Sequence, residues 1–242
     1  MSKVLTAHQP VYLPWLGLLH KIALADHFVW FDDVQYQVRD WNNRNKIKTN
    51  AGEIWLSVPV SRKNHFDIKV RDVEIDNTQA WARKHLKSIR LAYQKAPFFD
   101  RYIGFFDDLY AKQWTHLADL NRAILDFFMA EFKINVPITT LTEMNLSQTK
   151  SDLVLAMCVA HQADVYIFGA QGRNYADVAA FRAAGIEPVF QDYTHPNYAQ
   201  INGPFVSHMA ALDVLFNCGA DAHEIMMEGN WSRADLPAGV PA

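Results

Sequence analysis

The sequence predicts an α/β fold with a mainly parallel sheet that starts with a βαβ unit and carries a β-hairpin and a helical insert. Three observations favour this fold. An apolar strand, a polar loop, a helix and a second apolar strand follow one another within residues 4–31. Helical periodicity fills residues 78–133, and strands alternate with helices again from residue 136 onward. Such alternation is typical of parallel sheets, because two parallel strands need a crossover connection between them.

The first βαβ unit begins with a short apolar run at residues 4–7. The loop that follows holds Pro10 and Pro14, and Pro14 suits the first turn of a helix. Apolar side chains then recur at helical spacing, at Trp15, Leu18, Leu19 and Ile22. A second strand at residues 28–31 completes the unit, which predicts a right-handed crossover in a parallel sheet.

A hairpin and a helical insert occupy the middle of the chain. The predicted bounds are residues 45–49 and 54–60 for the hairpin strands, around a turn at residues 50–52, and about 78–133 for the insert. Pro97 interrupts the helical periodicity once, and residues 114–116 interrupt it again. Thr115 is the expected cap of the helix that follows.

The last third of the chain returns to alternating strands and helices. We expect strands at residues 136–141, 165–168 and 187–193, and helices at residues 151–161, 175–184 and 207–217. Ser151 is the expected cap of the first of these helices, and Gly185 and Gly219 end the other two. Residues 1–228 therefore form one predicted α/β domain, and the Pro/Gly/Ala-rich residues 229–242 form a predicted flexible tail.

Composition and charge exclude some classes of protein. Hydrophobic residues make up 50% and charged residues 20% of the 242 residues, which is typical of folded domains and not of disordered chains. A formal net charge of -3 argues against a nucleic-acid-binding surface, which is usually basic. The chain starts without a secretory signal, and no apolar run reaches the ~20 residues that span a bilayer. We therefore expect a cytoplasmic protein without a membrane span.

Cysteine and histidine spacing predicts neither a metal site nor a redox motif. Cys158 and Cys218 lie far apart, as unpaired thiols of a reducing compartment do. The ten histidines are scattered, and no pair has a ligand spacing. No metal and no tightly bound cofactor is predicted.

Polar residues cluster where the first two strands end. His8 directly follows the first strand, and a histidine there suits general acid or base catalysis near neutral pH. Asp32 follows the second strand at the same edge of the sheet, where it is placed to orient that histidine. Strand alternation lets only one of Asp32 and Asp33 face the site. The alternatives are a histidine that only ties down its loop and a solvated acidic turn.

A basic strip follows in the first strand of the hairpin. Arg44, Lys46 and Lys48 alternate, so a strand places all three on one face, where they suit a phosphate or a carboxylate. The alternative is that the lysines protect an edge strand from aggregation.

Two later segments are weaker candidates. Gly169 and Gly172 lie between a strand and a helix and allow close approach of a ligand to the backbone, but the spacing is neither a Walker nor a dinucleotide motif. His195 lies in a loop rich in aromatic and amide groups. It is either a second acid or base, a substrate contact or a structural histidine.

These segments together resemble the WbqC-like protein family. The matching pieces are HQPVYLPWLGLLHKI, FVWFDDVQY, WNNRNKIK, LSVPV, SDLVL, GAQGRNY, FQDYTHPNYAQ and LDVLFNCG, which span about residues 4–220. The polar positions of the family motifs fall on His8, Gln9, Tyr12, Lys21, Asp32, Gln35, Tyr36, Asn43, Arg44, Lys48, Tyr175, Gln191 and His195. Ala170 departs from the glycine or serine expected there, which puts a backbone anion site in doubt.

The resemblance implies transfer of an acyl or aminoacyl group to an amine, for example on an amino sugar, in bacterial polysaccharide or secondary-metabolite biosynthesis. His8 and Asp32 are then the expected catalytic residues, and the other motif positions bind the substrate. Gln9 and Tyr12 are expected to stabilise the oxyanion, while Arg44 and Lys48 hold a phosphate of the donor or the acceptor. The expected partners are a small-molecule substrate, a thioester donor and an acyl or peptidyl carrier protein.

Two alternatives stay open. The opening segment also resembles the start of nucleotidyltransferase-type α/β domains such as pantothenate synthetase, although their second histidine and glycine are absent here. That resemblance implies an adenylating or nucleotidyl-transfer enzyme. The other alternative is a non-catalytic protein that binds a partner through exposed tryptophans, for which the candidates are Trp41, Trp55, Trp81 and Trp114.

Overall fold

A five-stranded sheet forms the centre of the computed structural model, which describes residues 2–61 and 67–239. Its strands are β1 (Val4–His8), β2 (His27–Trp30), β5 (Ile138–Thr140), β6 (Val165–Phe168) and β7 (Glu187–Phe190). They are arranged in the order β5-β2-β1-β6-β7, and every neighbouring pair is parallel. The predicted parallel sheet and its opening βαβ unit are confirmed.

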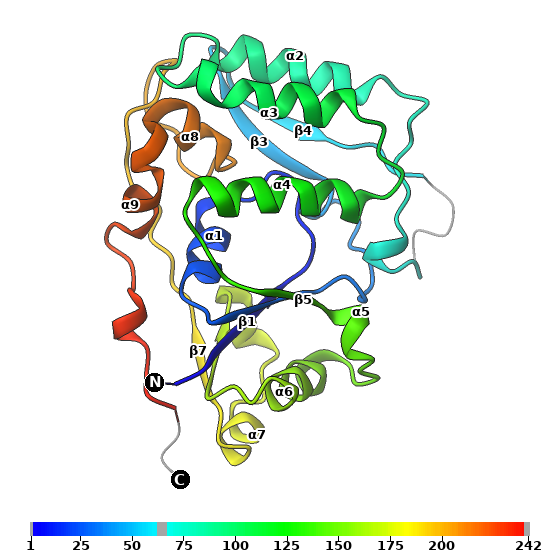
Figure 1. Cartoon of the computed structure of the whole chain (residues 1–242), viewed down its shortest axis with the longest axis vertical. Helices are drawn as coiled ribbons and strands as arrows, with labels where there is room; N and C mark the ends of the chain where they lie inside the picture. The colour runs from blue at the N-terminus through cyan, green and yellow to red at the C-terminus, as the bar shows by residue number, and fades with distance from the viewer. Residues whose placement is uncertain (1, 62–66, 240–242) are drawn as a thin grey trace.

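Helices cover both faces of this sheet (Figure 1). The helices are α1 (Leu16–Ala23), α2 (Trp81–Tyr93), α3 (Phe99–Ala111), α4 (Leu117–Glu131), α5 (Leu141–Met144), α6 (Lys150–Ala160), α7 (Val178–Ala183), α8 (Leu212–Cys218) and α9 (Ala222–Met227). Side chains of α6 and α7 pack with Leu5, Val29 and Phe168 on one face. Side chains of α1 and α4 share the other core cluster with Phe28 and Trp30. The sheet is therefore the middle layer of three.

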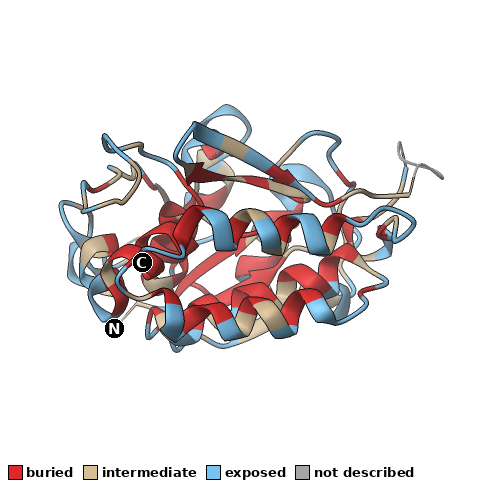
Figure 2. Cartoon of the chain, turned by 90° about the horizontal axis from the view of Figure 1, so that it is seen from above, coloured by how far each residue is buried: buried red, intermediate tan, exposed pale blue. Residues whose placement is uncertain are grey.

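The predicted hairpin and helical insert are also confirmed. Strands β3 (Arg44–Thr49) and β4 (Gly52–Ser57) pair antiparallel around a turn at residues 50–51. Ile47 and Leu56 are buried on the inner face of the hairpin, which packs on α2 and belongs to the same core cluster as α3 and α4. Figure 2 shows this arrangement from above, with the buried sides of the helices turned inward.

The sequence misplaced two helix caps. Thr115 does not cap α4, because the N-cap residue is His116 and its side chain makes no capping bond. Ser151 lies inside α6, and its hydroxyl accepts a hydrogen bond from the Asp177 N–H, 3.0 Å away. Thr115 is one position and Ser151 two positions away from the observed cap, which is within the ordinary uncertainty of helix boundaries.

The predicted flexible tail is docked over residues 229–239. The Arg233 guanidinium donates to the Ser2 carbonyl and pairs with Asp26 at 2.7 Å. The Trp231 carbonyl accepts a hydrogen bond from Nε2 of His20 at 2.9 Å. A Pro/Gly/Ala-rich composition does not reveal such partners, because they lie about 200 residues away in sequence. Residues 240–242 lie outside the described part of the chain.

The strand order places a binding crevice at one edge of the sheet. From β1 the chain crosses to α1 on one face, whereas from β6 it crosses to α7 on the opposite face. Because β1 and β6 are neighbours, their connections diverge at the carboxyl ends of the strands. In open α/β sheets ligands bind at such a point.

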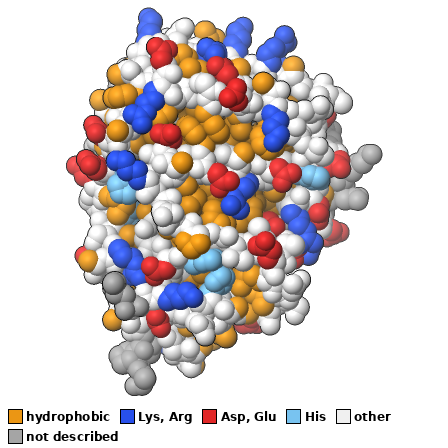
Figure 3. Space-filling model, in the orientation of Figure 1, with side chains coloured by type: hydrophobic (Ala, Val, Ile, Leu, Met, Phe, Trp, Pro, Cys, Tyr) orange, Lys and Arg blue, Asp and Glu red, His pale blue; other side chains and the backbone are white. Residues whose placement is uncertain are grey.

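The outer surface alternates in charge. On the face drawn in Figure 3, basic and acidic side chains are interspersed among apolar ones, and several basic side chains lie at the end formed by α2 and α3. Among the described residues, no helix is both long enough and apolar enough to span a membrane.

Candidate active site

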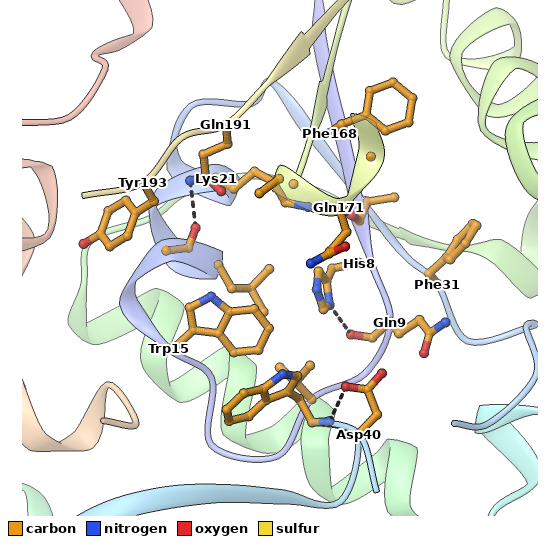
Figure 4. Close-up of a pocket in the computed structure, with 18 of the residues that line it drawn as sticks. His8, Gln9, Trp15, Lys21, Phe31, Asp40, Phe168, Gln171, Gln191 and Tyr193 are labelled. Carbon is orange, nitrogen blue, oxygen red and sulfur yellow. Dashed lines mark hydrogen bonds between the residues drawn. The ribbon is translucent and has the colours of Figure 1, made fainter. Parts of the chain in front are cut away.

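A cavity of about 690 Å³ opens at the carboxyl ends of the strands (Figure 4). The end of β1, helix α1, the loop before β3 and the segments after β2, β6 and β7 supply its walls. The lining residues are Ala7, His8, Gln9, Val11, Trp15, Gly17, Leu18, Lys21, Phe31, Asp40, Trp41, Asn42, Val154, Tyr166, Phe168, Gly169, Ala170, Gln171, Gly172, Tyr175, Gln191, Asp192, Tyr193 and His208. The cavity lies where the strand order predicts a ligand.

His8 is the last residue of β1 and points into this cavity (Figure 4). Its Nδ1 atom lies 2.8 Å from the Gln9 carbonyl, which can only accept, so Nδ1 carries the hydrogen. Burial and the nearby charge of Lys21 lower the pKa of His8 to about 3. The imidazole is therefore neutral at physiological pH. Its Nε2 atom has a free lone pair and no hydrogen-bond partner among the described residues.

Lys21 lies on α1 with only 4% of its surface exposed. Its Nζ atom donates a hydrogen bond to the Ala7 carbonyl at 2.9 Å, and no described carboxylate pairs with it. Burial lowers the pKa of Lys21 to about 7. At neutral pH a large fraction of this lysine is the uncharged amine, which accepts a proton readily.

Two glutamine side chains present donors to the cavity. The Oε1 atom of Gln9 accepts from the Asn42 amide at 3.3 Å, and Oε1 of Gln171 accepts from the Asn174 amide at 2.9 Å. Each glutamine therefore has its oxygen engaged, while its NH₂ group has no partner among the described residues. Amide NH₂ groups held in this way suit an oxygen atom that gains negative charge.

Gln191 holds the sheet and α1 together at the side of the cavity. Its Nε2 atom donates to the Gly17 carbonyl at 2.9 Å and to Nδ1 of His20 at 2.8 Å. Gly17 packs closely there, because a Cβ atom would lie 3.0 Å from the Tyr193 ring and the ring would have to move by a few tenths of an ångström. The Oε1 atom of Gln191 remains an acceptor without a described partner.

The fixed charges of the cavity are negative. Asp40 and Asp192 contribute carboxylates, and one Asp40 oxygen accepts the Trp41 N–H at 2.7 Å. Lys21 is the one lysine among the lining residues of the described chain, and no described arginine lines the cavity. The charge favours a cationic ligand over a phosphate. Among the described residues, no three His, Cys, Asp or Glu side chains are grouped to hold a metal ion.

Five of the residues predicted for the site lie together in the cavity: His8, Gln9, Lys21, Tyr175 and Gln191. Eight do not line it: Tyr12, Asp32, Gln35, Tyr36, Asn43, Arg44, Lys48 and His195. Whether a predicted residue lines the cavity depends on which element carries it. Residues directly after β1, β6 and β7 or on the inner face of α1 reach the cavity, whereas most of those after β2 and in the hairpin do not.

Asp32 does not orient His8. Its carboxylate accepts from the N–H of Thr142 at 3.1 Å and from the Thr142 hydroxyl at 2.8 Å, at the start of α5. The neighbouring Asp33 pairs with Lys69 at 2.7 Å and with Arg71. Neither aspartate lines the cavity, so the expected His8–Asp32 pair is not formed.

Four other motif residues lie outside the cavity, and three of them are held within the protein. The Tyr12 hydroxyl lies 2.7 Å from Nδ1 of His85 inside the core, too far inside to reach an oxyanion. Tyr36 is buried, which raises its pKa to about 12. Asn43 donates to the Val58 carbonyl at 2.8 Å. Gln35 is exposed and bridges to Lys69 through the backbone.

The basic strip shares one face of β3, as its alternation predicts, but each side chain has a different environment. Lys46 pairs with Glu53 at 2.6 Å. Lys48 is buried and donates to the Gly203 carbonyl at 3.2 Å. The Arg44 guanidinium lies 4.5 Å from the centroid of the Trp55 ring. The three cations therefore do not form a single anion site.

His195 lies just behind the cavity wall. Its Nδ1 atom donates to the Pro196 carbonyl at 2.9 Å, and its ring centroid is 4.8 Å from that of His208, which lines the cavity. The described structure thus places His195 next to a cavity residue and not in the cavity itself.

Sequence reasoning missed several lining residues, chiefly Trp15, Trp41, Asp40, Gln171, Tyr193 and His208. Trp15 and Trp41 stand within the family motifs, but the sequence predicted Trp15 on the apolar face of a helix and Trp41 as an exposed contact for a partner. His208 carried no recognisable motif. Its backbone φ of 61° is unusual for a residue other than glycine, and this was visible only in the structure.

Neither cysteine is placed to act as a nucleophile. Burial raises the pKa of Cys158 far above its usual value and that of Cys218 to about 11. Both are unpaired thiols, and neither lines the cavity. A thiol with a raised pKa is a poor nucleophile.

Comparison with known proteins identifies relatives along most of the chain. The chain is 34% identical over 220 residues to Rv1507c, an uncharacterised protein of Mycobacterium tuberculosis, and this match covers 90% of the chain and 95% of the relative. The model of the WbqC-like protein family matches residues 9–225. That match includes Gln9, Lys21, Tyr175 and Gln191 of the cavity wall. The protein therefore belongs to the WbqC-like protein family.

Proposed function

We propose that this protein transfers an acyl or aminoacyl group from a thioester to the amine of a small acceptor such as an amino sugar, in cytoplasmic polysaccharide or secondary-metabolite biosynthesis. One observation carries the proposal. The cavity combines carboxylates that attract an ammonium ion with a buried lysine whose pKa of about 7 leaves about half of it uncharged at neutral pH. Amide formation needs both, because an amine enters as an ammonium ion and attacks only after it loses a proton.

Lys21 and His8 have different tasks in the proton balance. The neutral form of Lys21 takes one proton from the acceptor's ammonium group, and the free amine then attacks the thioester carbonyl. The carbon–sulfur bond breaks, and Nε2 of His8 carries a second proton from the attacking nitrogen to the departing sulfur. Lys21 then releases its proton to water. The products are an amide and a thiol.

The geometry of His8 suits a carrier of protons better than a terminal base. Its hydrogen-bonded Nδ1 fixes the tautomer and leaves Nε2 as the acceptor. A pKa of about 3 means that His8 gives up an accepted proton at once, which favours transfer onward to sulfur. The backbone carbonyl of Gln9 orients His8, whereas the sequence led us to expect the carboxylate of Asp32 in that role.

The NH₂ groups of Gln9 and Gln171 are the candidate oxyanion donors. Both residues line the cavity with their side-chain oxygens held by asparagines, so their orientation is set before the substrate binds. Donors fixed in advance stabilise the charge that develops on the carbonyl oxygen in the transition state.

The nucleotidyl-transfer alternative has less support. A triphosphate in the cavity would lie next to the carboxylates of Asp40 and Asp192 without an arginine in the described lining. The partner-binding alternative loses two of its four tryptophans, since Trp81 and Trp114 are 5% and 8% exposed.

An assay of amide formation tests the proposal. The protein is incubated with acyl- and aminoacyl-thioesters of coenzyme A or pantetheine and with a panel of amino sugars. Thiol release is followed with a thiol reagent, and the amide is identified by mass spectrometry. His8→Ala is expected to lower the rate about 100-fold with the fold unchanged, because proton transfer by a positioned side chain contributes ~10²–10⁴.

The matched control is His116→Ala, a histidine that lies outside the cavity and is expected to leave the rate unchanged. A wild-type rate in His8→Ala contradicts the shuttle role. If no thioester and amine react while the protein releases pyrophosphate from ATP or CTP, nucleotidyl transfer replaces the proposal.

A further inference from the structure

Three tryptophan rings lead from the cavity to the outer surface. Trp15 contacts the His8 ring at a centroid distance of 5.4 Å, Trp41 lies 5.6 Å from Trp15, and Trp55 lies 5.5 Å from Trp41. We call Trp15, Trp41 and Trp55 the tryptophan shelf. Trp15 and Trp41 line the cavity, whereas Trp41 and Trp55 are 38% and 44% exposed.

Positive charge gathers at the outer end of this shelf. The Arg44 guanidinium lies 4.5 Å and the Lys46 ammonium 5.2 Å from the centroid of the Trp55 ring. Lys46 is neutralised by Glu53, but Arg44 has no carboxylate partner among the described residues and donates only to the Arg39 carbonyl. The Arg44 charge is therefore available to an anion.

The outer end of the tryptophan shelf and the cavity carry charges of opposite sign. The cavity has carboxylates and no described arginine, while the shelf ends at an arginine without a counter-ion. A ligand that spans both would place its phosphates at Trp55 and its reacting end beside Lys21. Exposed tryptophan faces next to an arginine are typical of sites that stack a planar base and hold the attached phosphates.

We infer that the tryptophan shelf binds a nucleoside diphosphate, with its base on Trp41 and Trp55 and its diphosphate on Arg44. This inference rests on the proposed function, because the same chemical group occurs on two substrates of the reaction. It is part of a thioester donor of the coenzyme A type and of a nucleotide-linked amino sugar. In either case the attached chain or sugar extends along Trp15 into the cavity.

Calorimetric titration of the whole protein with ADP and with UDP tests the inference. Both nucleotides are expected to bind, and Trp55→Ala is expected to weaken binding at least about 10-fold, since stacking of a base on an aromatic ring contributes that much. Arg44→Gln is expected to weaken binding and to reduce its sensitivity to salt. Trp55 is partly exposed, so circular dichroism serves to check that the variant is folded.

Two matched variants serve as controls. Trp231→Ala removes another exposed tryptophan, and Arg101→Gln removes another arginine that lies over an aromatic ring, 5.1 Å from the centroid of Tyr102. Both are expected to bind the nucleotides as the wild type does. Equal binding by Trp55→Ala, Arg44→Gln and the wild type overturns the inference, as does binding of uridine or adenosine with the affinity of the diphosphates.

The preference between nucleotides identifies the source. Tighter binding of ADP assigns the shelf to the donor, and tighter binding of UDP assigns it to the acceptor. If neither nucleotide binds and the amide still forms, the shelf inference fails alone. If a diphosphate binds but no thioester and amine react, the proposed function fails and the binding site remains.

Discussion

Two buried lysines of this protein lie in regions that differ in how many of their polar groups are hydrogen-bonded. Lys21 in the cavity and Lys48 on β3 are 4% and 2% exposed, and each donates to a backbone carbonyl. Lys48 lies near the fully buried Asp213. Burial raises the pKa of Asp213, and its hydrogen bonds and the charge of Lys48 oppose that rise. Lys21 has no carboxylate partner among the described residues.

The region around Lys48 uses nearly all of its hydrogen-bonding capacity. Asp213 accepts from the Tyr93 hydroxyl at 2.7 Å, from the Tyr198 hydroxyl at 3.0 Å and from the Gln200 amide at 2.8 Å. The Asn217 amide bonds the same residue. Networks that are satisfied in this way fix the packing of the elements they join, here α2, α8 and the loop after β7.

In the cavity, several polar atoms have no hydrogen-bond partner among the described residues. Nε2 of His8, the NH₂ groups of Gln9 and Gln171 and Oε1 of Gln191 all lack partners among the described residues. These atoms belong to residues that line the cavity, where a ligand can bond them, whereas the groups around Lys48 bond one another and stabilise the fold.

The largest effect is expected from Asp213→Ala. This change leaves two tyrosine hydroxyls, two amides and the Lys48 charge without their carboxylate, and breaking a buried charged network costs about 3–5 kcal/mol. Urea denaturation followed by circular dichroism measures the loss. A loss below ~1 kcal/mol would show that the network does not stabilise the fold.

Lys21→Met is expected to act in the opposite direction and raise stability. Because the pKa of Lys21 falls to about 7 in the folded protein, the unfolded chain binds more protons between pH 7 and about pH 10.4. Wild-type stability therefore rises with pH through that window. The variant gains roughly 2–4 kcal/mol at pH 7, after the loss of the hydrogen bond to Ala7, and little at pH 10.

Denaturation of both proteins at several pH values measures this gain. Lys48→Met is the matched control, because it removes the other buried lysine and leaves Asp213 without that charge. It is expected to lower stability at pH 7. A pH-independent difference between Lys21→Met and the wild type would show that Lys21 keeps an ordinary pKa.

The smallest effect is expected from Thr142→Val, which removes the hydroxyl donor of Asp32. Since Thr142 is exposed and its backbone N–H still bonds Asp32, the cost is about 1 kcal/mol. Amide formation is expected to continue at the wild-type rate. A 100-fold slower reaction in this variant would restore Asp32 to the catalytic machinery.

The sequence predicted the strands and the edge of the sheet where the cavity lies, because both follow from the local alternation of apolar and polar residues. His8, the last residue of β1, and Gln191, directly after β7, line the cavity at the strand ends where the sequence placed them. Tyr12, Asp32 and Lys48 were misplaced, since their partners His85, Thr142 and Gly203 lie 73 to 155 residues away. Such contacts depend on tertiary packing and leave no local pattern.

Heteronuclear NMR titration of the lysine side chains tests the central claim, that Lys21 is poised to accept a proton. With lysine labelled at the ε-carbon, the resonance of each side chain is measured from pH 5 to pH 11. The resonance that is missing in Lys21→Arg is that of Lys21. One lysine resonance is expected to have a midpoint near pH 7, and it is expected to disappear in Lys21→Arg and to persist in Lys48→Arg. A Lys21 resonance with a midpoint near the ordinary lysine value of about 10.4 would contradict this claim.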